Sequence, residues 1–292
     1  MMAGVSKRPQ AWSMFTTAQA RRVAGVLTDI DDTLTAEGAI TADALAALHA
    51  LRAAGLPVIA VTGRPLGWSS PFARDWPLDA IVAENGAVAV FREGVEQAGR
   101  ARDTTASHEL RIEYAQDAAT RAANALRLAA VARRLLAEVL GSTLARDSAG
   151  RVTDIAIDHA EYAHLDAEQI ERCVAVMREE GMNATVSSIH VNGWYGEHDK
   201  LSGARWIVRR LFGRDLEAER ADWVYVGDST NDQRMFSHFD ASVGVANLMD
   251  FADRLEVWPA YLTRAARGAG FAEVAHRLIE ARGESQEPRR PA

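Results

Sequence analysis

Short apolar runs that end in acidic or hydroxyl side chains constrain the fold of this chain most strongly. The run VLTDIDDTL at Val26–Leu34 places two carboxylates, Asp29 and Asp31, directly after an apolar strand. Side chains of an extended segment alternate with a period of two, so a strand ending at Asp29 turns Asp31 toward the same small volume. Taken alone, the pattern fits either a reactive carboxylate pair or a helix-capping turn.

Further apolar runs follow, and amphipathic helical stretches such as ADALAALHALRAA separate them. Val58–Arg64 (VIAVTGR) reads as a second buried strand and Ala80–Ala83 as a third. This alternation predicts an α/β fold, with a parallel sheet covered by helices on both faces. Ligands of such sheets bind beyond the carboxyl ends of the strands, which is where Asp29, Thr62 and Asp228 fall.

The character of the sequence changes near Phe91. A long Ala/Arg-rich helical stretch precedes two strand-like runs, STLAR and RVTDIAID, and Asp166 with Gln169 resembles a capping box for a second helix. ATVSSIHVN predicts one further strand. We therefore predict an inserted α+β domain over 91–195 and an α/β core formed by 23–90 and 196–283. Residues 1–22 and 284–292 are predicted to be mobile tails, with docking of Trp12 and Phe15 left open.

Composition narrows the function classes. The formal net charge is -7, which argues against a general binder of nucleic acid or of anionic membranes. No apolar run approaches the roughly 20 residues that span a bilayer, and the N-terminus lacks the apolar core of a secretory signal. The single cysteine, Cys173, excludes an intrachain disulfide. We expect a cytoplasmic protein.

Four segments, in order and type, resemble the signature motifs of the haloacid dehalogenase (HAD) superfamily of phosphoryl-transfer enzymes. They are VLTDIDDTL, VIAVTGR, the helical run HDKLSGARWIV that contains Lys200, and WVYVGDSTND, which contains Asp228. The insertion between the second and third motifs resembles a C2 cap of subfamily IIB, as do ENGA, GVAN and PAYLT. Mannosyl-3-phosphoglycerate and sucrose-phosphate phosphatases are the most similar members, because they too carry Ser after the motif Asp. The resemblance implies a Rossmann-like doubly wound parallel-sheet core with an inserted α+β cap domain.

The resemblance also implies roles for individual residues. Asp29 would attack phosphorus, and Asp31 would protonate the leaving alcohol and then deprotonate water. Thr62, Gly63 and Lys200 would bind the phosphoryl oxygens. Because a carboxylate cannot approach a phosphate dianion without a cation, Mg²⁺ is expected as cofactor. The predicted metal site comprises Asp29, Asp31 through its backbone carbonyl, Asp228 and Asp232, with Asn231 orienting the ligands; the predicted further substrate contacts are Arg64, Asn85, Arg151, His190 and Asn247.

The leading functional hypothesis is an Mg²⁺-dependent phosphatase of a small phosphate ester, either a phosphosugar or a phosphoglycerate derivative. A phosphotransferase of the phosphomannomutase type and a non-catalytic protein that binds a phospho-ligand are the alternatives. A signalling receiver module is disfavoured because Lys200 lies beyond a whole extra domain. A nicotinamide-binding protein is disfavoured because no G-x-G-x-x-G follows the first strand. The sequence carries no marker of oligomeric state.

Overall fold

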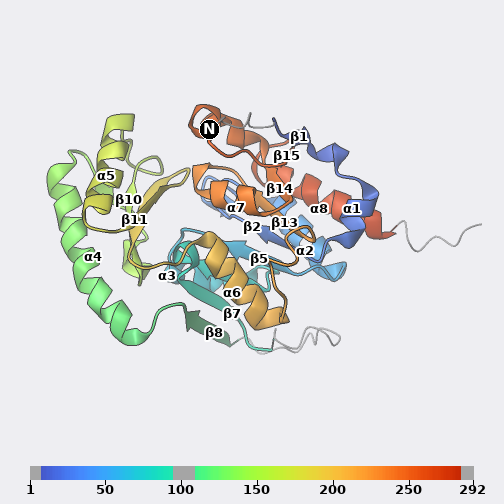
Figure 1. The fold of residues 1–292 in the computed structure, drawn as a ribbon, viewed down its shortest axis with the longest axis horizontal. Coiled ribbons are helices and arrows are strands. Elements are labelled where there is room, and N and C mark those ends of the chain that lie inside the picture. Colours follow the sequence, from blue (N-terminus) through green and yellow to red (C-terminus); the bar gives the residue numbers. More distant parts are fainter. Residues whose placement is uncertain (1–7, 95–108, 284–292) are drawn as a thin grey trace, which may run out of the picture. The chain divides into compact units, whose positions relative to one another are not determined.

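The structure is a computed structural model that describes residues 8–94 and 109–283, and the chain divides into two compact units (Figure 1). Unit 1 comprises residues 1–60, 76–80 and 208–292, and unit 2 comprises residues 61–75 and 81–207. Helix α6 (Lys200–Phe212) begins in unit 2 and ends in unit 1.

Unit 1 is built on a parallel sheet. Its strands lie in the order β1-β15-β14-β13-β2-β5, and every neighbouring pair is parallel. The bounds are β1 Gln10–Ala11, β2 Gly25–Thr28, β5 Val58–Val61, β13 Trp223–Gly227, β14 Ala241–Gly244 and β15 Tyr261–Leu262. Every residue of β2, β5, β13 and β14 is buried, as expected for parallel strands covered on both faces.

Helix α8 (Arg267–Gly283) packs against α1 (Thr17–Arg22) and α2 (Ala42–Ala53), beside which it lies in Figure 1. Helix α2 begins where predicted, because the Thr41 side chain accepts a hydrogen bond from the Ala44 N–H. A Cβ at Gly268 would lie 1.8 Å from Thr41 Oγ1, so the close approach of α8 to this cap requires glycine. The remaining elements of unit 1 are η1 Trp12–Met14, β3 Thr35–Ala36, β4 Ala39–Ile40, η5 Thr230–Asp232, α7 Gln233–His238 and η6 Ala246–Arg254.

The prediction of a mobile N-terminal tail is wrong for residues 10–22. Trp12 and Phe15 are 3% and 2% exposed, their rings stack at 4.4 Å, and both meet Tyr261 edge-on. The segment is held because these aromatic rings bury a large apolar area and β1 adds to the sheet edge beside β15. Residues 1–7 and the predicted C-terminal tail, 284–292, lie outside the described residues.

Unit 2 contains two groups of antiparallel strands. In the first, strands β6 (Ala80–Ala83), β7 (Val88–Arg92) and β8 (Leu110–Tyr114) pair in sequence order, and α3 (Leu66–Asp75) packs on β7. The second has the order β11-β12-β10-β9, with β9 Thr143–Leu144, β10 Asp154–Asp158, β11 Asn183–Val186 and β12 His190–Trp194. Short 3-10 turns, η2 Glu84–Gly86 and η4 Ser148–Gly150, follow β6 and β9.

Two helices cover the four-stranded sheet of unit 2. Helices α4 (Ala118–Glu138) and α5 (Ala167–Glu179) pack on its strands, and the predicted capping box of Asp166 and Gln169 starts α5. Ile155 and Ile157 of β10 belong to the core beneath these helices. Because side chains alternate along a strand, Asp154 and Asp158 lie on the opposite face.

The single strand predicted for ATVSSIHVN is two strands. Strands β11 and β12 form an antiparallel hairpin. In the turn between them, the Ser187 hydroxyl accepts a hydrogen bond from the His190 N–H at 3.0 Å. The sequence hides this break because the serines that close the turn also fit an extended strand. His190 and Asn192 remain on one face of β12, where His190 pairs with Asp158 and Asn192 with Ala156.

The predicted fold class is confirmed, since the parallel sheet of unit 1 and the α+β insertion form a Rossmann-like α/β fold with a cap. The boundaries at 91 and 195 remain a prediction. Within residues 8–94 and 109–283, no helix has both the length and the apolar character needed to cross a membrane.

Replacing Trp12 by Ala tests whether the N-terminal segment belongs to the folded core. We expect the free energy of unfolding to fall by about 3 kcal/mol, because a buried indole leaves a cavity. Urea unfolding followed by circular dichroism measures the change, and Met14→Ala, whose side chain is 64% exposed, is the control. Equal midpoints for both variants would show that the segment contributes nothing to stability.

Candidate active site

Three carboxylates of unit 1 meet at the carboxyl ends of two neighbouring strands. Asp29 directly follows β2, Asp228 follows β13, and Asp232 ends the turn η5. The two strands are adjacent and parallel, and the Asp29 N–H donates to Val226 O at 2.8 Å. One ligand atom of each carboxylate lies within 4.8 Å of the others, and all three side chains are buried.

Hydrogen bonds fix the Asp232 carboxylate. Its Oδ2 accepts the backbone N–H groups of Asp228 and Ser229 at 2.9 and 3.2 Å. Its Oδ1 accepts the hydroxyl of Tyr225 at 2.5 Å. Burial raises the pKa of the Tyr225 phenol well above its usual value, and the charge of Asp232 raises it further, so the hydroxyl keeps the proton that it donates. A Cβ at Gly227 would lie 2.5 Å from Asp232 Oδ2, so this loop requires glycine.

The acidic cluster fits a hard divalent cation. The ligand oxygens of octahedral Mg²⁺ stand about 3 to 4 Å apart, and the three carboxylates already lie close to that spacing. Buried carboxylates repel one another, and a cation between them removes the repulsion. Asn231 accepts a hydrogen bond from the Ser229 hydroxyl at 3.0 Å, next to the ligands it was predicted to orient.

The loop that carries the half-buried Asp31 is held from α8. Asn247 Nδ2 donates to Asp32 O at 3.0 Å, while Asn247 Oδ1 accepts the Arg267 N–H at 2.9 Å. Arg267 Nε donates to Asp32 Oδ1 at 2.8 Å, and both residues have positive φ angles, 53° for Asp32 and 52° for Arg267. Asn247 was predicted to contact substrate; in the structure its amide fixes the loop after Asp29. The roles of Asp32 and Arg267 were missed, because their contact spans 235 residues.

The other predicted site residues belong to unit 2. Thr62 follows β5, its hydroxyl accepts the Arg64 N–H at 3.0 Å, and its carbonyl accepts the Asn85 N–H at 3.0 Å. Lys200 begins α6 and is 4% exposed. A Cβ at Gly86 would lie 2.0 Å from Asp199 O, so the start of α6 lies against the turn that carries Asn85. The structure thus brings the Thr62, Asn85 and Lys200 segments together within unit 2.

Arg64 is paired with two carboxylates of the inserted segment. Its guanidinium lies 3.2 Å from Asp147 and 2.9 Å from Glu161. Glu161 Oε2 also lies 3.1 Å from His190 Nε2. Burial by itself would raise the pKa of Glu161, but the hydrogen bonds from His190 and Arg64 outweigh it and lower the pKa to about 2. Glu161 is therefore ionised at neutral pH.

Arg151 connects the Gly63 carbonyl with Asp147, which also pairs with Arg64, and with Asp154. Its Nη1 donates to Gly63 O and to Asp154 Oδ2, each at 2.9 Å, and its Nη2 lies 3.1 Å from Asp147. Asn192 Nδ2 donates to Gly63 O at 3.4 Å and to Asp154 Oδ2 at 3.3 Å. Burial raises the pKa of Asp154 to about 7 despite the Arg151 charge.

Glu84 fastens the four-stranded sheet to the end of β6, a role that sequence reasoning missed. Its carboxylate accepts the Leu66 N–H at 3.0 Å, the Thr153 N–H at 2.6 Å and the Thr153 hydroxyl at 2.5 Å. A second close approach lies beside it, because a Cβ at Gly67 would be 2.7 Å from Gly150 Cα. The sequence feature that could have indicated this role is the position of an acidic residue directly after a buried strand.

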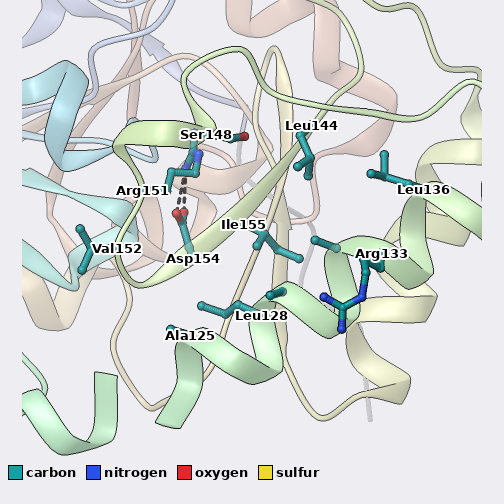
Figure 2. A pocket seen from close by; sticks show the side chains of 12 residues that line it. Ala125, Leu128, Arg133, Leu136, Leu144, Ser148, Arg151, Val152, Asp154 and Ile155 are labelled. Carbon is teal, nitrogen blue, oxygen red and sulfur yellow. Dashed lines mark hydrogen bonds and ion pairs between the residues drawn. The ribbon is translucent and has the colours of Figure 1, made fainter. Parts of the chain in front are cut away.

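A cavity of about 380 Å³ lies in unit 2, and the ion-paired residues Arg151 and Asp154 are part of its lining (Figure 2). Most of its lining is apolar, including Leu128, Ile155 and Leu144. Two of the charged residues that line it, Arg151 and Asp154, form an ion pair at 2.9 Å, and a third, Arg133, is exposed on α4.

Comparison with known proteins is consistent with this geometry. Residues 26–109 match the family of haloacid dehalogenase-like hydrolases. No curated protein matches the sequence significantly. The predicted resemblance to the haloacid dehalogenase superfamily is confirmed over these residues.

Solved structures share the fold across nearly the whole chain. A Synechocystis sucrose-phosphatase in complex with sucrose and phosphate has 15% identity and a TM-score of 0.59, covering 88% of this chain and 98% of that chain. The C-terminal domain of C. albicans trehalose-6-phosphate phosphatase has 12% identity and a TM-score of 0.63, with coverages of 94% and 99%. A sugar phosphatase of HAD subclass IIB has 16% identity and a TM-score of 0.56, with coverages of 88% and 100%.

Replacing Tyr225 by Phe tests the hydrogen bond that orients Asp232. We expect the free energy of unfolding without metal to fall by about 2 kcal/mol, because a buried carboxylate oxygen loses its donor. Urea unfolding measures the loss, and Tyr261→Phe, which loses only a hydrogen bond from Gln19 at 3.4 Å, is the matched control. A Tyr225→Phe variant as stable as the control would contradict the assignment.

Proposed function

We propose that the protein is an Mg²⁺-dependent phosphatase of a small phosphorylated metabolite that works through a phosphoaspartate on Asp29. The buried cluster of Asp29, Asp228 and Asp232 carries the proposal. Three carboxylates at adjacent strand ends suit an ion that draws a phosphate ester to a nucleophile. The sucrose-phosphatase, the trehalose-6-phosphate phosphatase and the subclass IIB sugar phosphatase that share the fold support this substrate class.

Asp29 and Asp228 would hold the metal, with Asp232 and the Asp31 carbonyl completing the protein ligands. Bound Mg²⁺ supplies positive charge that offsets the repulsion between a carboxylate and a phosphate dianion. The Asp29 carboxylate attacks phosphorus and the ester oxygen leaves, which splits one difficult displacement into two easier ones. Asp31, half-buried in the next loop, gives its proton to the leaving oxygen and then takes one from the water that hydrolyses the acyl phosphate.

Unit 2 is proposed to supply the groups that hold the phosphoryl oxygens. The Thr62 hydroxyl and the Gly63 N–H donate hydrogen bonds, and the Lys200 ammonium adds charge opposite to that of the transition state. The four-stranded sheet with α4 and α5 is the cap in this proposal. Arg151, which donates to the Gly63 carbonyl, and His190, which lies beside Glu161, then face the leaving group in this proposal.

Replacing Asp29 by Asn tests the nucleophile. We expect kcat to fall at least roughly 1,000-fold, because an amide cannot form the phosphoaspartate. The fold should stay intact, because the Asn side chain has nearly the same shape as Asp. Release of inorganic phosphate from p-nitrophenyl phosphate and a panel of sugar phosphates measures activity, and Asp43→Asn on the exposed side of α2 is the control. Turnover near the wild-type rate would exclude Asp29 as nucleophile, and phosphate release only with an acceptor sugar would indicate a phosphotransferase.

Withdrawal of metal tests the acidic cluster independently of turnover. We expect Mg²⁺ at about 100 times its Kd to stabilise the wild-type protein by about 2.7 kcal/mol. The same addition should leave Asp228→Asn almost unchanged and should stabilise Asp43→Asn as much as wild type. Thermal unfolding after chelation and after Mg²⁺ addition measures the effect. An equal shift in Asp228→Asn would place the metal elsewhere.

A further inference from the structure

Arg64, the residue that follows Gly63, is already paired with carboxylates. The Arg64 side chain is 4% exposed and lies 2.9 Å from Glu161 and 3.2 Å from Asp147. Glu161 and Asp147 are themselves 18% and 12% exposed, so they reach solvent where Arg64 does not. A group that approaches Gly63 from solvent therefore meets carboxylate oxygens before it meets the guanidinium.

The second cation is also neutralised. The Arg151 side chain is 2% exposed, and it lies 2.9 Å from Asp154 and 3.1 Å from Asp147. Two guanidinium groups thus share three carboxylates, counting Glu161. In a desolvated setting charges interact more strongly than in water, so this excess of negative charge opposes a further anion.

Neutral amides flank Gly63 on two sides. A Cβ at Gly63 would lie 3.3 Å from Asn192 Oδ1 and 3.3 Å from Asn85 Oδ1. Asn85 Nδ2 is buried and has no hydrogen-bond partner among the described residues, and Asn85 itself is 2% exposed. Amide groups both donate and accept, which matches hydroxyl groups rather than carboxylates.

Several hydrogen bonds hold the loops that carry the carboxylates around Gly63. The Asp158 carboxylate accepts the backbone N–H groups of four residues of the following loop, Ala160 to Ala163, at 2.9 to 3.2 Å. That loop carries Glu161. The Glu84 carboxylate fixes the loop on the other side, before β10. Carboxylates held in this way cannot turn aside to admit an anionic ligand, because each loop would lose several charge-assisted hydrogen bonds.

We infer that the Gly63 surface of unit 2 binds the leaving group of the substrate and selects an uncharged, hydroxyl-bearing one over one that carries a carboxylate or a second phosphate. The inference rests on the proposed function and narrows it. Neutral sugar phosphates fit this surface, whereas phosphoglycerates and sugar bisphosphates do not.

Matched ester pairs test the selection at pH 8, where Asp154 is ionised. One pair is glucose 1-phosphate and glucuronic acid 1-phosphate, and another is glycerol 3-phosphate and 3-phosphoglycerate. We expect kcat/KM for the neutral member to exceed that for the anionic member at least about tenfold in each pair. Binding of the same pairs to Asp29→Asn with Mg²⁺, measured by calorimetry, should show the same preference without any turnover.

Replacing Glu161 by Gln identifies the cause of the preference. The variant removes the carboxylate that lies 2.9 Å from Arg64, so the neutral-to-anionic ratio should fall about tenfold, mainly through better binding of the anionic ester. Glu168→Gln, the same substitution on the exposed start of α5, should leave the ratio unchanged.

The outcomes separate the two levels of the argument. Absence of phosphate release from every ester, including p-nitrophenyl phosphate, would overturn the proposed function, and the binding ratios would still decide the selection. Equal or stronger binding of the anionic members would overturn the inference even if the protein is a phosphatase. If Glu161→Gln has the same neutral-to-anionic ratio as the wild type, the excess of carboxylates is not the cause of the preference.

Discussion

The convergence of three buried carboxylates at the ends of β2 and β13 is the constraint on which the rest of the structure depends. Asp29, Asp228 and Asp232 lie within 4.8 Å of one another, where like charges repel strongly in a medium of low dielectric constant. The protein offsets the repulsion partly with hydrogen bonds, since the Tyr225 hydroxyl and two backbone N–H groups donate to Asp232. A divalent cation would offset what remains. The parallel order of the strands therefore brings acidic residues from distant parts of the sequence together at the carboxyl-terminal edge of the sheet.

Sequence reasoning predicted the elements whose determinants are local. The Asp166–Gln169 pair starts its helix as expected, because a cap needs only residues three positions apart, and Thr41 caps α2 over the same short distance. The buried strands were visible as apolar runs. The hairpin at Ser187 was not, since serine fits both a turn and a strand. The mobile N-terminal tail was wrong because the partner of Trp12, the Tyr261 ring, lies almost 250 residues away in the chain.

The residues of the candidate site show the same difference between local and long-range determinants. Asp29 and Asp228 could be predicted because strand ends and motif spacing are readable in the sequence. The ion pair of Arg64 with Glu161 could not be, because its partners are 97 residues apart and Glu161 lies in a loop without periodicity. Glu84 illustrates an intermediate case. Its position after a buried strand was a signal, but its partners Val152 and Thr153 become neighbours only after the insertion folds.

The two units hold their carboxylates in different settings, and the proposed function gives the units different tasks. In unit 1 three carboxylates gather within 4.8 Å of one another, and in the proposed function this cluster binds a metal ion and, through it, a phosphate group. Around Gly63 in unit 2, Arg64 and Arg151 are each matched by carboxylates. A surface that is neutral or slightly negative adds no affinity for a second anion, so its contribution must come from hydrogen bonds to uncharged oxygens. In the proposed function, attraction of the phosphate and selection of the group attached to it therefore depend on different residues, and each could change in evolution without loss of the other.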